Sequence, residues 1–183
     1  MRVIAGKARR ILLDAPKGLV TRPTTDRIKE TLFNIINQDL PGATFLDLFA
    51  GSGAIGIEAL SRGSKSAVFV ECDREALSCI AANLERVRLA GDAKILPMEV
   101  MGALTYLRNA EPFDIIFMDP PYRGNWVEKV LMALADNAVC SRDTLVIFEA
   151  AIKEETAFIG ECGFEVIREK SYKTNKHIFV KKK

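Results

Sequence analysis

The sequence of 183 residues contains one histidine, one tryptophan and four cysteines, and these shortages exclude several kinds of protein. No two cysteines have the C-x2-C spacing of a structural zinc site, so we expect reduced, mostly buried thiols and no metal. No apolar run approaches the roughly 18 residues of a membrane span. The N-terminus also lacks the apolar stretch of a secretory signal. We therefore expect a cytoplasmic protein that is not bound to a membrane.

The charged residues are unevenly distributed along the chain. Residues 1–30 carry eight Lys or Arg against three acidic residues, and residues 168–183 carry seven against one, although the net charge is only +2. Basic ends on an acidic body are typical of a surface that binds a polyanion. The basic residues near the N-terminus alternate with apolar ones, which favours a folded basic ribbon. Lys181–Lys183 are equally well explained as an aid to solubility.

The pattern of apolar residues divides the chain into an extension, residues 1–37, and a main domain, residues 38–183. In the extension we expect a β-hairpin of two short strands, then a helix. From residue 43, strand-like and helical stretches alternate, which predicts an α/β fold with a mainly parallel seven-stranded sheet and helices on both faces. The expected strands are 2–5, 9–13, 44–48, 67–71, 93–97, 114–118, 144–149, 164–168 and 176–181. The expected helices are 24–37, 54–62, 74–89, 99–109, 126–138 and 152–161.

Residues 47–56, DLFAGSGAIG, contain G-x-G-x-x-G between an expected strand and an expected helix, a pattern that fits NAD or S-adenosylmethionine. Glu71 ends the next strand, where a carboxylate can accept hydrogen bonds from ribose hydroxyls. Asp47 favours S-adenosylmethionine, because a carboxylate repels a pyrophosphate but attracts sulfonium and ammonium groups. Alternatively, Asp47 only caps the loop through backbone N–H groups. Glu99 either accepts from the adenine amino group or simply opens a helix.

A second motif, Asp119-Pro120-Pro121-Tyr122, follows the fourth strand of the main domain. The amine of an aromatic base is a poor nucleophile, because its lone pair is delocalised into the ring. The Asp119 carboxylate and the Pro120 carbonyl can accept its two N–H bonds and stabilise the developing positive charge. Tyr122 offers a face on which an extruded base can stack. Alone, the motif could be a rigid strand-exit turn, but its place in this sheet favours amine methylation.

These motifs resemble those of a known family. DLFAGSG and DPPY resemble motifs I and IV of the amino-group methyltransferases. RPTTDRIKETLF at 22–33, GIEALSRG at 56–63 and the opening RVIAG narrow the resemblance to the bacterial small-subunit ribosomal RNA guanine-N2 methyltransferases, often called the RsmD family. Two departures are Glu99, where related sequences often have Asp or Asn, and GKARRI in place of a glycine-rich opening with an aromatic residue.

The resemblance implies a Rossmann-like methyltransferase domain with an N-terminal β-hairpin and S-adenosylmethionine as methyl donor. The implied target is guanine N2 of 16S ribosomal RNA, either free or in the small ribosomal subunit. The candidate catalytic residues are Asp119, Pro120, Pro121 and Tyr122. The candidate cofactor-binding residues are Asp47, Phe49, Gly51, Gly53, Glu71, Cys72 and Glu99. The candidate RNA-binding residues are Arg2, Lys7, Arg9, Arg10, Arg22 and Arg27.

Two other functions fit parts of the sequence. A DNA methyltransferase acting on adenine N6 or cytosine N4 would use the same D-P-P-Y chemistry, but the chain has no evident extra domain for reading a DNA sequence. A non-catalytic RNA-binding assembly factor could keep a methyltransferase fold, but Asp47, Glu71 and Asp119 are intact. His177 has no partner visible in the sequence and is expected to be structural. We expect a monomer.

Overall fold

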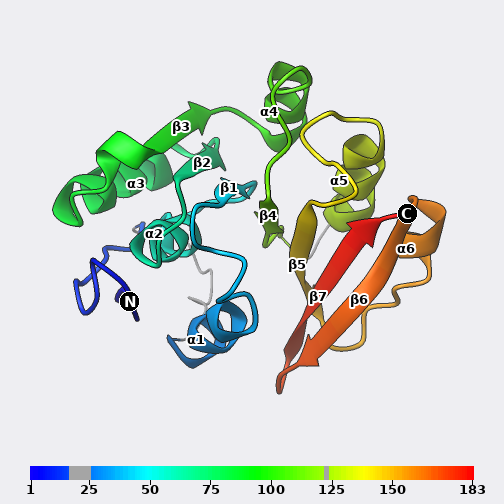
Figure 1. Ribbon diagram of the computed structural model, residues 1–183, viewed down its shortest axis with the longest axis horizontal. Helices are drawn as coiled ribbons and strands as arrows, with labels where there is room; N and C mark the ends of the chain where they lie inside the picture. Colours follow the sequence, from blue (N-terminus) through cyan, green and yellow to red (C-terminus); the bar gives the residue numbers. More distant parts are fainter. Residues whose placement is uncertain (17–25, 122–123) are drawn as a thin grey trace. The chain divides into compact units, whose positions relative to one another are not determined.

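The computed structural model describes residues 1–16, 26–121 and 124–183, which fold as two compact units, Met1–Met98 and Glu99–Lys183 (Figure 1). The first unit contains α1 (Asp26–Ile35), β1 (Thr44–Asp47), α2 (Ala54–Ser61), β2 (Ser66–Glu71), α3 (Arg74–Arg86), the 3-10 helix η1 (Ala90–Asp92) and β3 (Ala93–Pro97). The second contains α4 (Val100–Tyr106), β4 (Ile115–Met118), α5 (Trp126–Ala135), β5 (Leu145–Ala151), α6 (Phe158–Glu161), β6 (Phe164–Ser171) and β7 (Asn175–Lys182). The division at residue 37 that the sequence favours stays a prediction.

The strands of the first unit are parallel and lie in the order β3-β2-β1. Asp47 pairs with Phe69, and Glu71 pairs with Pro97, so the carboxyl ends of all three strands lie at one edge. α2 packs on β1 and β2, and every one of its residues is buried. A Cβ on Gly56 would lie 2.4 Å from the Phe69 ring, so this helix approaches the sheet only because position 56 is glycine.

The second unit has a parallel pair, β4 and β5, extended by the antiparallel strands β7 and β6. The units together hold the seven strands expected for the main domain, all close to their expected positions. The expected helix at 152–161 is wrong over most of its length. β5 continues to Ala151, and the Ile152 N–H donates to the Thr174 carbonyl at 3.2 Å, so sheet pairing overrides a locally helical pattern.

The N-terminal segment, residues 1–16, turns back on itself as expected but forms only one antiparallel bridge, between Arg2 and Leu12. The expected strands 2–5 and 9–13 do not form at full length. The backbone N–H groups of Ile4 and Ala5 instead donate to the two carboxylate oxygens of Glu58 on α2, at 2.8 and 3.0 Å. The segment is therefore pinned to the helix that follows the glycine loop.

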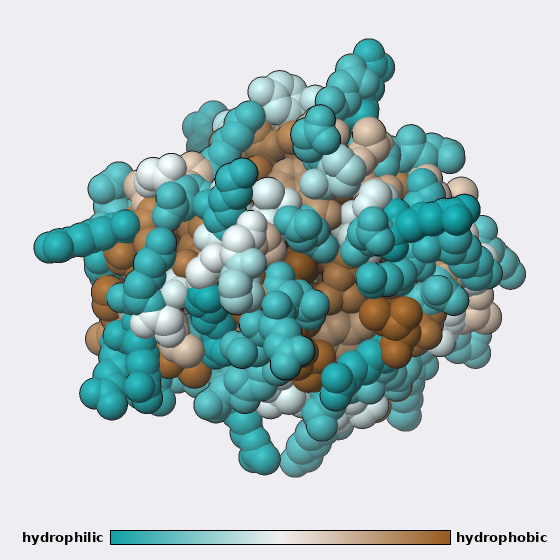
Figure 2. Space-filling view, in the orientation of Figure 1, coloured by the Kyte–Doolittle hydropathy of each residue, from teal (hydrophilic) through white to brown (hydrophobic). Residues whose placement is uncertain are grey.

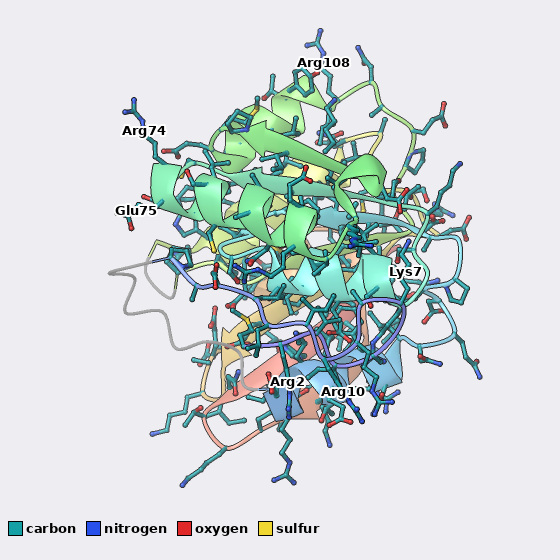
Figure 3. The ribbon with its side chains drawn as sticks, turned by 90° about the vertical axis from the view of Figure 1, so that its left-hand side faces the viewer. Arg2, Lys7, Arg10, Arg74, Glu75 and Arg108 are labelled. Atoms are coloured by element: carbon teal, nitrogen blue, oxygen red, sulfur yellow. The ribbon has the colours of Figure 1, made fainter. Side chains whose placement is uncertain are left out.

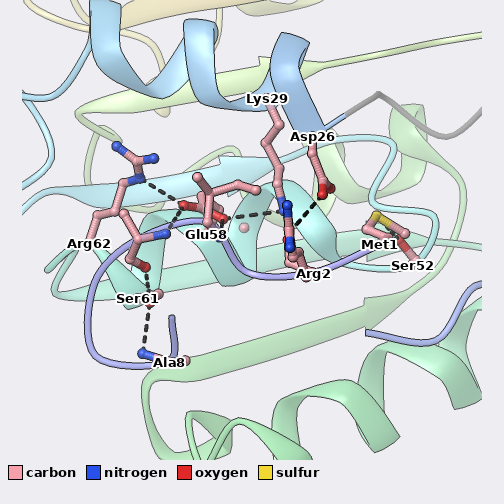
Figure 4. Close-up of polar contacts among 12 residues, drawn as sticks. Met1, Arg2, Ala8, Asp26, Lys29, Ser52, Glu58, Ser61 and Arg62 are labelled. Atoms are coloured by element: carbon pink, nitrogen blue, oxygen red, sulfur yellow. Dashed lines mark hydrogen bonds and ion pairs between the residues drawn. The ribbon is translucent and has the colours of Figure 1, made fainter. Parts of the chain in front are cut away.

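Glu58 is the centre of a buried cluster of charges that sequence reasoning missed (Figure 4). The Lys29 Nζ lies 3.2 Å from Glu58 Oε2 and donates to the Arg2 carbonyl at 2.6 Å. The Arg62 Nε lies 2.8 Å from Glu58 Oε1. Burial lowers the pKa of Lys29, and the neighbouring Glu58 carboxylate opposes that shift. This Glu58 cluster (Lys29, Glu58 and Arg62) ties α1, α2 and the N-terminal segment together.

Hydrophilic side chains cover most of the face drawn in Figure 2, with isolated apolar patches between them. Within the described ranges, the exposed large apolar side chains are Leu12, Met101, Tyr106, Met132, Ile152, Val166 and Ile167. All four cysteines are free, and Cys79, Cys140 and Cys162 are buried as expected. No described helix has the length and apolar character to cross a membrane.

Candidate functional site

The glycine loop between β1 and α2 is a tight turn that leaves open space beside its backbone. The Gly53 N–H donates to the Ala50 carbonyl at 2.7 Å, and both Gly51 and Gly53 have positive φ, 54° and 79°. A Cβ on Gly51 would meet no atom within 4 Å. The turn therefore needs glycine for its conformation and exposes bare backbone to which a ligand can approach closely.

Asp47, the last residue of β1, is 1% exposed and holds the start of α2 in place. Its Oδ2 accepts from the Gly56 N–H at 3.2 Å, whereas the buried Oδ1 has no hydrogen-bond partner among the described residues. Burial raises the pKa of Asp47 to about 7; the Gly56 and Phe49 N–H groups oppose this shift, and the nearby Glu71 carboxylate adds to it. A buried acceptor without a partner fits a cationic ligand, which would satisfy its charge and its hydrogen-bonding capacity.

Glu71, expected to bind a ribose, joins two loops at the same edge of the sheet. Its Oε2 accepts from the Gly51 N–H at 2.8 Å, and its Oε1 accepts from Cys72 and Asp73 at 2.8 and 2.9 Å. These bonds fix the glycine loop against the start of α3. Because a carboxylate has about four acceptor sites, Glu71 retains capacity for ribose hydroxyls in this position. The structure thus brings Asp47, Gly51, Gly53 and Glu71 together in the first unit.

The other three candidate cofactor residues have less distinctive surroundings. Phe49 is half-buried in the glycine loop, and Cys72 is exposed after β2. Glu99 is exposed at the N-terminus of α4, and its side chain makes no capping hydrogen bond there. Contacts of these three residues with the cofactor stay predictions.

The D-P-P motif lies in the second unit, directly after β4, whose four residues are buried. Asp119 is half-buried, Pro120 is buried and Pro121 is exposed. Tyr122 lies outside the described residues. Because β4 and β5 are parallel, the motif lies at the carboxyl edge of this pair, where α/β sheets bind their ligands.

Comparison with known proteins identifies the family. The profile of the family described as Conserved hypothetical protein 95 matches residues 1–181. Ribosomal RNA small subunit methyltransferase D of Escherichia coli is 37% identical over 153 residues, which cover 84% of this chain and 76% of that protein. The chain belongs to this family, the RsmD family of ribosomal RNA methyltransferases.

Solved structures support the assignment of this chain to the RsmD family. A chain from Escherichia coli assigned as a methyltransferase, yhhF, superposes with a TM-score of 0.84 at 33% identity, covering 100% of this chain and 97% of that one. A more distant neighbour, the methyltransferase SMU.776 in complex with SAH, shares the fold, with a TM-score of 0.65 at 17% identity over 81% of this chain and 49% of its own. The fold is the expected Rossmann-like methyltransferase fold, and the cofactor is S-adenosylmethionine.

The ionisation of Asp47 should make cofactor affinity depend on pH. The pKa of Asp47 is about 7 without ligand, and a cationic cofactor favours the carboxylate. Below pH 7 binding must release this proton, so affinity should fall by up to about tenfold for each pH unit. Calorimetry with S-adenosylmethionine between about pH 5.5 and 7 tests this, and Asp47→Asn should flatten the profile. A wild-type affinity that does not change over this range contradicts a contact between Asp47 and the cofactor.

The candidate RNA-binding residues differ in their surroundings. Figure 3 labels three of them, Arg2, Lys7 and Arg10, on the N-terminal segment, which faces the viewer. Arg2 pairs with Asp26 at 2.9 Å, and Lys7 pairs with Asp92 at 3.1 Å. Arg9, Arg10 and Arg27 are exposed, and Arg9 and Arg10 have no acidic partner within the described part of the chain. Arg22 lies outside the described residues.

A buried polar cluster in the second unit was not expected from the sequence. His177 is fully buried, with its Nδ1 3.1 Å from the Tyr172 hydroxyl and its Nε2 3.4 Å from Glu149 Oε2. We call Tyr172, His177 and Glu149 the His177 cluster. The only sign of this cluster in the sequence is that Glu149 lies near the end of an expected strand. Glu149 and His177 are far apart in the chain and meet only through the antiparallel pairing of β5 and β7.

Proposed function

We propose that this chain transfers a methyl group from S-adenosylmethionine to the exocyclic N2 amine of a guanine in small-subunit ribosomal RNA. The observation that carries the proposal is the glycine loop of the first unit, where Asp47 and Glu71 lie at the carboxyl edge of β1 and β2. There the buried Asp47 Oδ1 has no hydrogen-bond partner among the described residues. The D-P-P motif, with Asp119 and Pro120, follows β4 of the second unit. The relative from Escherichia coli, named a small-subunit ribosomal RNA methyltransferase, supports the choice of RNA.

In the proposed reaction this chain's residues orient the amine rather than remove its proton beforehand. Asp119 and the Pro120 carbonyl accept the two N2–H bonds, which turns the nitrogen lone pair toward the methyl group. The N–C bond forms as the bond from sulfur to the methyl carbon breaks, and the positive charge that develops on nitrogen is stabilised by the Asp119 carboxylate. The excess proton on nitrogen passes to water after transfer, so no strong base is needed in the first step.

Transfer of labelled methyl groups tests the proposal and its rivals together. Purified protein is incubated with labelled S-adenosylmethionine and with ribosomal RNA, small-subunit particles or DNA, and the products are digested to nucleosides. We expect N2-methylguanosine from RNA or particles. Label in N6-methyladenine or N4-methylcytosine of DNA would identify a DNA methyltransferase. RNA binding without label in any substrate would identify a non-catalytic assembly factor.

Arg9 and Arg10 are the residues that we expect to contact RNA phosphates. Replacing both, Arg9→Ser with Arg10→Gly, should weaken RNA binding and reduce the slope of log K against log salt by about 0.7 for each lost contact. The fold should survive, because Arg10 has a φ of 71°, a conformation that glycine adopts more easily than arginine.

The matched control for this double variant is Lys65→Ser with Arg142→Ser, which removes the same charge from exposed positions elsewhere. Deletion of the whole segment is less informative, because it also removes the buried Val3 and Ala8. Equal salt slopes for the wild type and the Arg9/Arg10 variant would show that these arginines are only a solvated surface.

A further inference from the structure

The His177 cluster places an ordered carboxylate near the end of β5. Glu149 is 8% exposed, and its Oε2 faces the Nε2 of the fully buried His177 at 3.4 Å. The His177 ring is itself fixed by edge contacts with Tyr172 and Phe117, with ring centroids 5.2 and 6.2 Å apart. Maintaining a carboxylate at such depth is costly unless its partners are well placed. The fixed His177 ring is therefore the partner that orients the Glu149 carboxylate.

Tyr172 contributes the hydroxyl group of this cluster. Burial, together with the Glu149 charge, raises the pKa of Tyr172 to about 12, so the phenol keeps its proton at neutral pH. This hydroxyl is 3.1 Å from His177 Nδ1, and the opposite ring nitrogen, Nε2, faces Glu149 Oε2 at 3.4 Å, an ion-pair distance at which Nε2 makes no hydrogen bond to a described residue. Tyr172 and His177 thus act as positioning residues for the Glu149 carboxylate.

The register of the strands places Glu149 beside Asp119. The parallel pairing of β4 and β5 ends at Met118 and Phe148; Asp119 is the first residue after β4, and Glu149 is the next residue of β5. Phe117 contacts His177, whose side chain also reaches Glu149, so these groups share one face of the sheet. If the alternation of β4 continues for one residue beyond its end, Asp119, two residues after Phe117, lies on the same face. On this register the two carboxylates are neighbours at this edge.

Two adjacent acceptors match the Watson–Crick edge of guanine, which presents N1–H beside the N2 amine. Adenine and cytosine present a lone pair beside their amine, and a carboxylate repels it. We propose that Glu149 is a specificity-determining residue that accepts the N1–H of the target guanine while Asp119 accepts from N2. This inference rests on the proposed function, because it assumes that guanine N2 is the methylated amine.

The experiment uses an analogue that keeps the target amine and lacks the N1 proton. After the methylated nucleotide has been mapped with the wild type, RNA is ligated with guanine or 2-aminopurine at that position. Wild-type kcat/KM should favour guanine by about ten- to a hundredfold, the range for a hydrogen bond to a charged group. Glu149→Gln, whose amide can donate to an unprotonated N1, should reduce this preference at least about tenfold. Tyr172→Phe should reduce it in the same direction.

Glu165→Gln, an exposed carboxylate on β6, is the matched control and should keep the wild-type preference. Equal wild-type rates on guanine and 2-aminopurine would overturn the inference. This comparison uses only the wild type and so does not depend on a variant folding correctly. It is also overturned when Glu149→Gln loses activity equally on both bases, as a purely structural role requires. If the wild type forms no N2-methylguanosine at all, the proposed function itself fails, which the nucleoside digest distinguishes from the other results.

Discussion

Asp119→Ala should slow methyl transfer by at least about a hundredfold in single-turnover assays, the cost typical of removing one group that stabilises transition-state charge. The affinity for S-adenosylmethionine should stay within a few fold, because Asp119 is proposed to act on the base amine. Asp119→Asn should retain weak activity, since the amide oxygen can still accept one N–H bond. Rapid-quench measurement of methylated RNA, with calorimetry of cofactor binding, gives both quantities.

Asp143→Ala is the matched control for Asp119→Ala, because Asp143 is an exposed aspartate in the same unit. Its rate should equal that of the wild type. A near-normal single-turnover rate in Asp119→Ala would show that the chemistry takes place elsewhere. A large loss of cofactor affinity in the same variant would instead make Asp119 a cofactor-binding residue.

Glu58→Ala should have the largest effect on stability of any single change considered for this chain. Glu58 is 0% exposed and interacts with Lys29, Arg62 and the backbone N–H groups of Ile4 and Ala5. Removing one partner of a buried ion pair typically costs about 3–5 kcal/mol, because the remaining charge stays buried without compensation. In a domain of this size, that corresponds to a fall in Tm of about 6–20 °C.

Urea denaturation measures this change in the free energy of unfolding. Glu85→Ala, at an exposed position on α3, should change it by less than about 0.5 kcal/mol. Adding Lys29→Met to Glu58→Ala should recover part of the loss, since the uncompensated ammonium is then removed. A cost below about 1 kcal/mol for Glu58→Ala would show that water or a rearrangement satisfies the remaining charges.

The glycine loop and the D-P-P motif could be placed from the sequence because both depend on local constraints. A turn with two residues at positive φ requires glycine at Gly51 and Gly53, and Gly56 permits close packing of a helix on a strand. Both motifs follow strands that are buried and read as short apolar runs. The sequence therefore determined the order of the elements and which loops lie at the carboxyl ends of the strands.

The N-terminal segment and residues 152–161 show where local patterns fail. The alternation of residues in the segment predicts two strands, but Ile4 and Ala5 give their N–H groups to a side chain. Residues 152–161 have a locally helical pattern, but Ile152 pairs with Thr174. In each case a contact between distant residues decides the backbone conformation, and such a contact leaves no periodic pattern of residues in the sequence.

By itself, the sequence determined the fold class and the positions of the glycine loop and the D-P-P motif, because glycine turns, proline turns and apolar strands are specified by neighbouring residues. Only the tertiary structure decided which charged side chains are buried. Lys29 and Glu58 are 29 positions apart, and Glu149 and His177 are 28 apart, yet each pair is in contact. A charge can be buried only where a partner compensates it, and that partner is supplied by folding rather than by the neighbouring sequence.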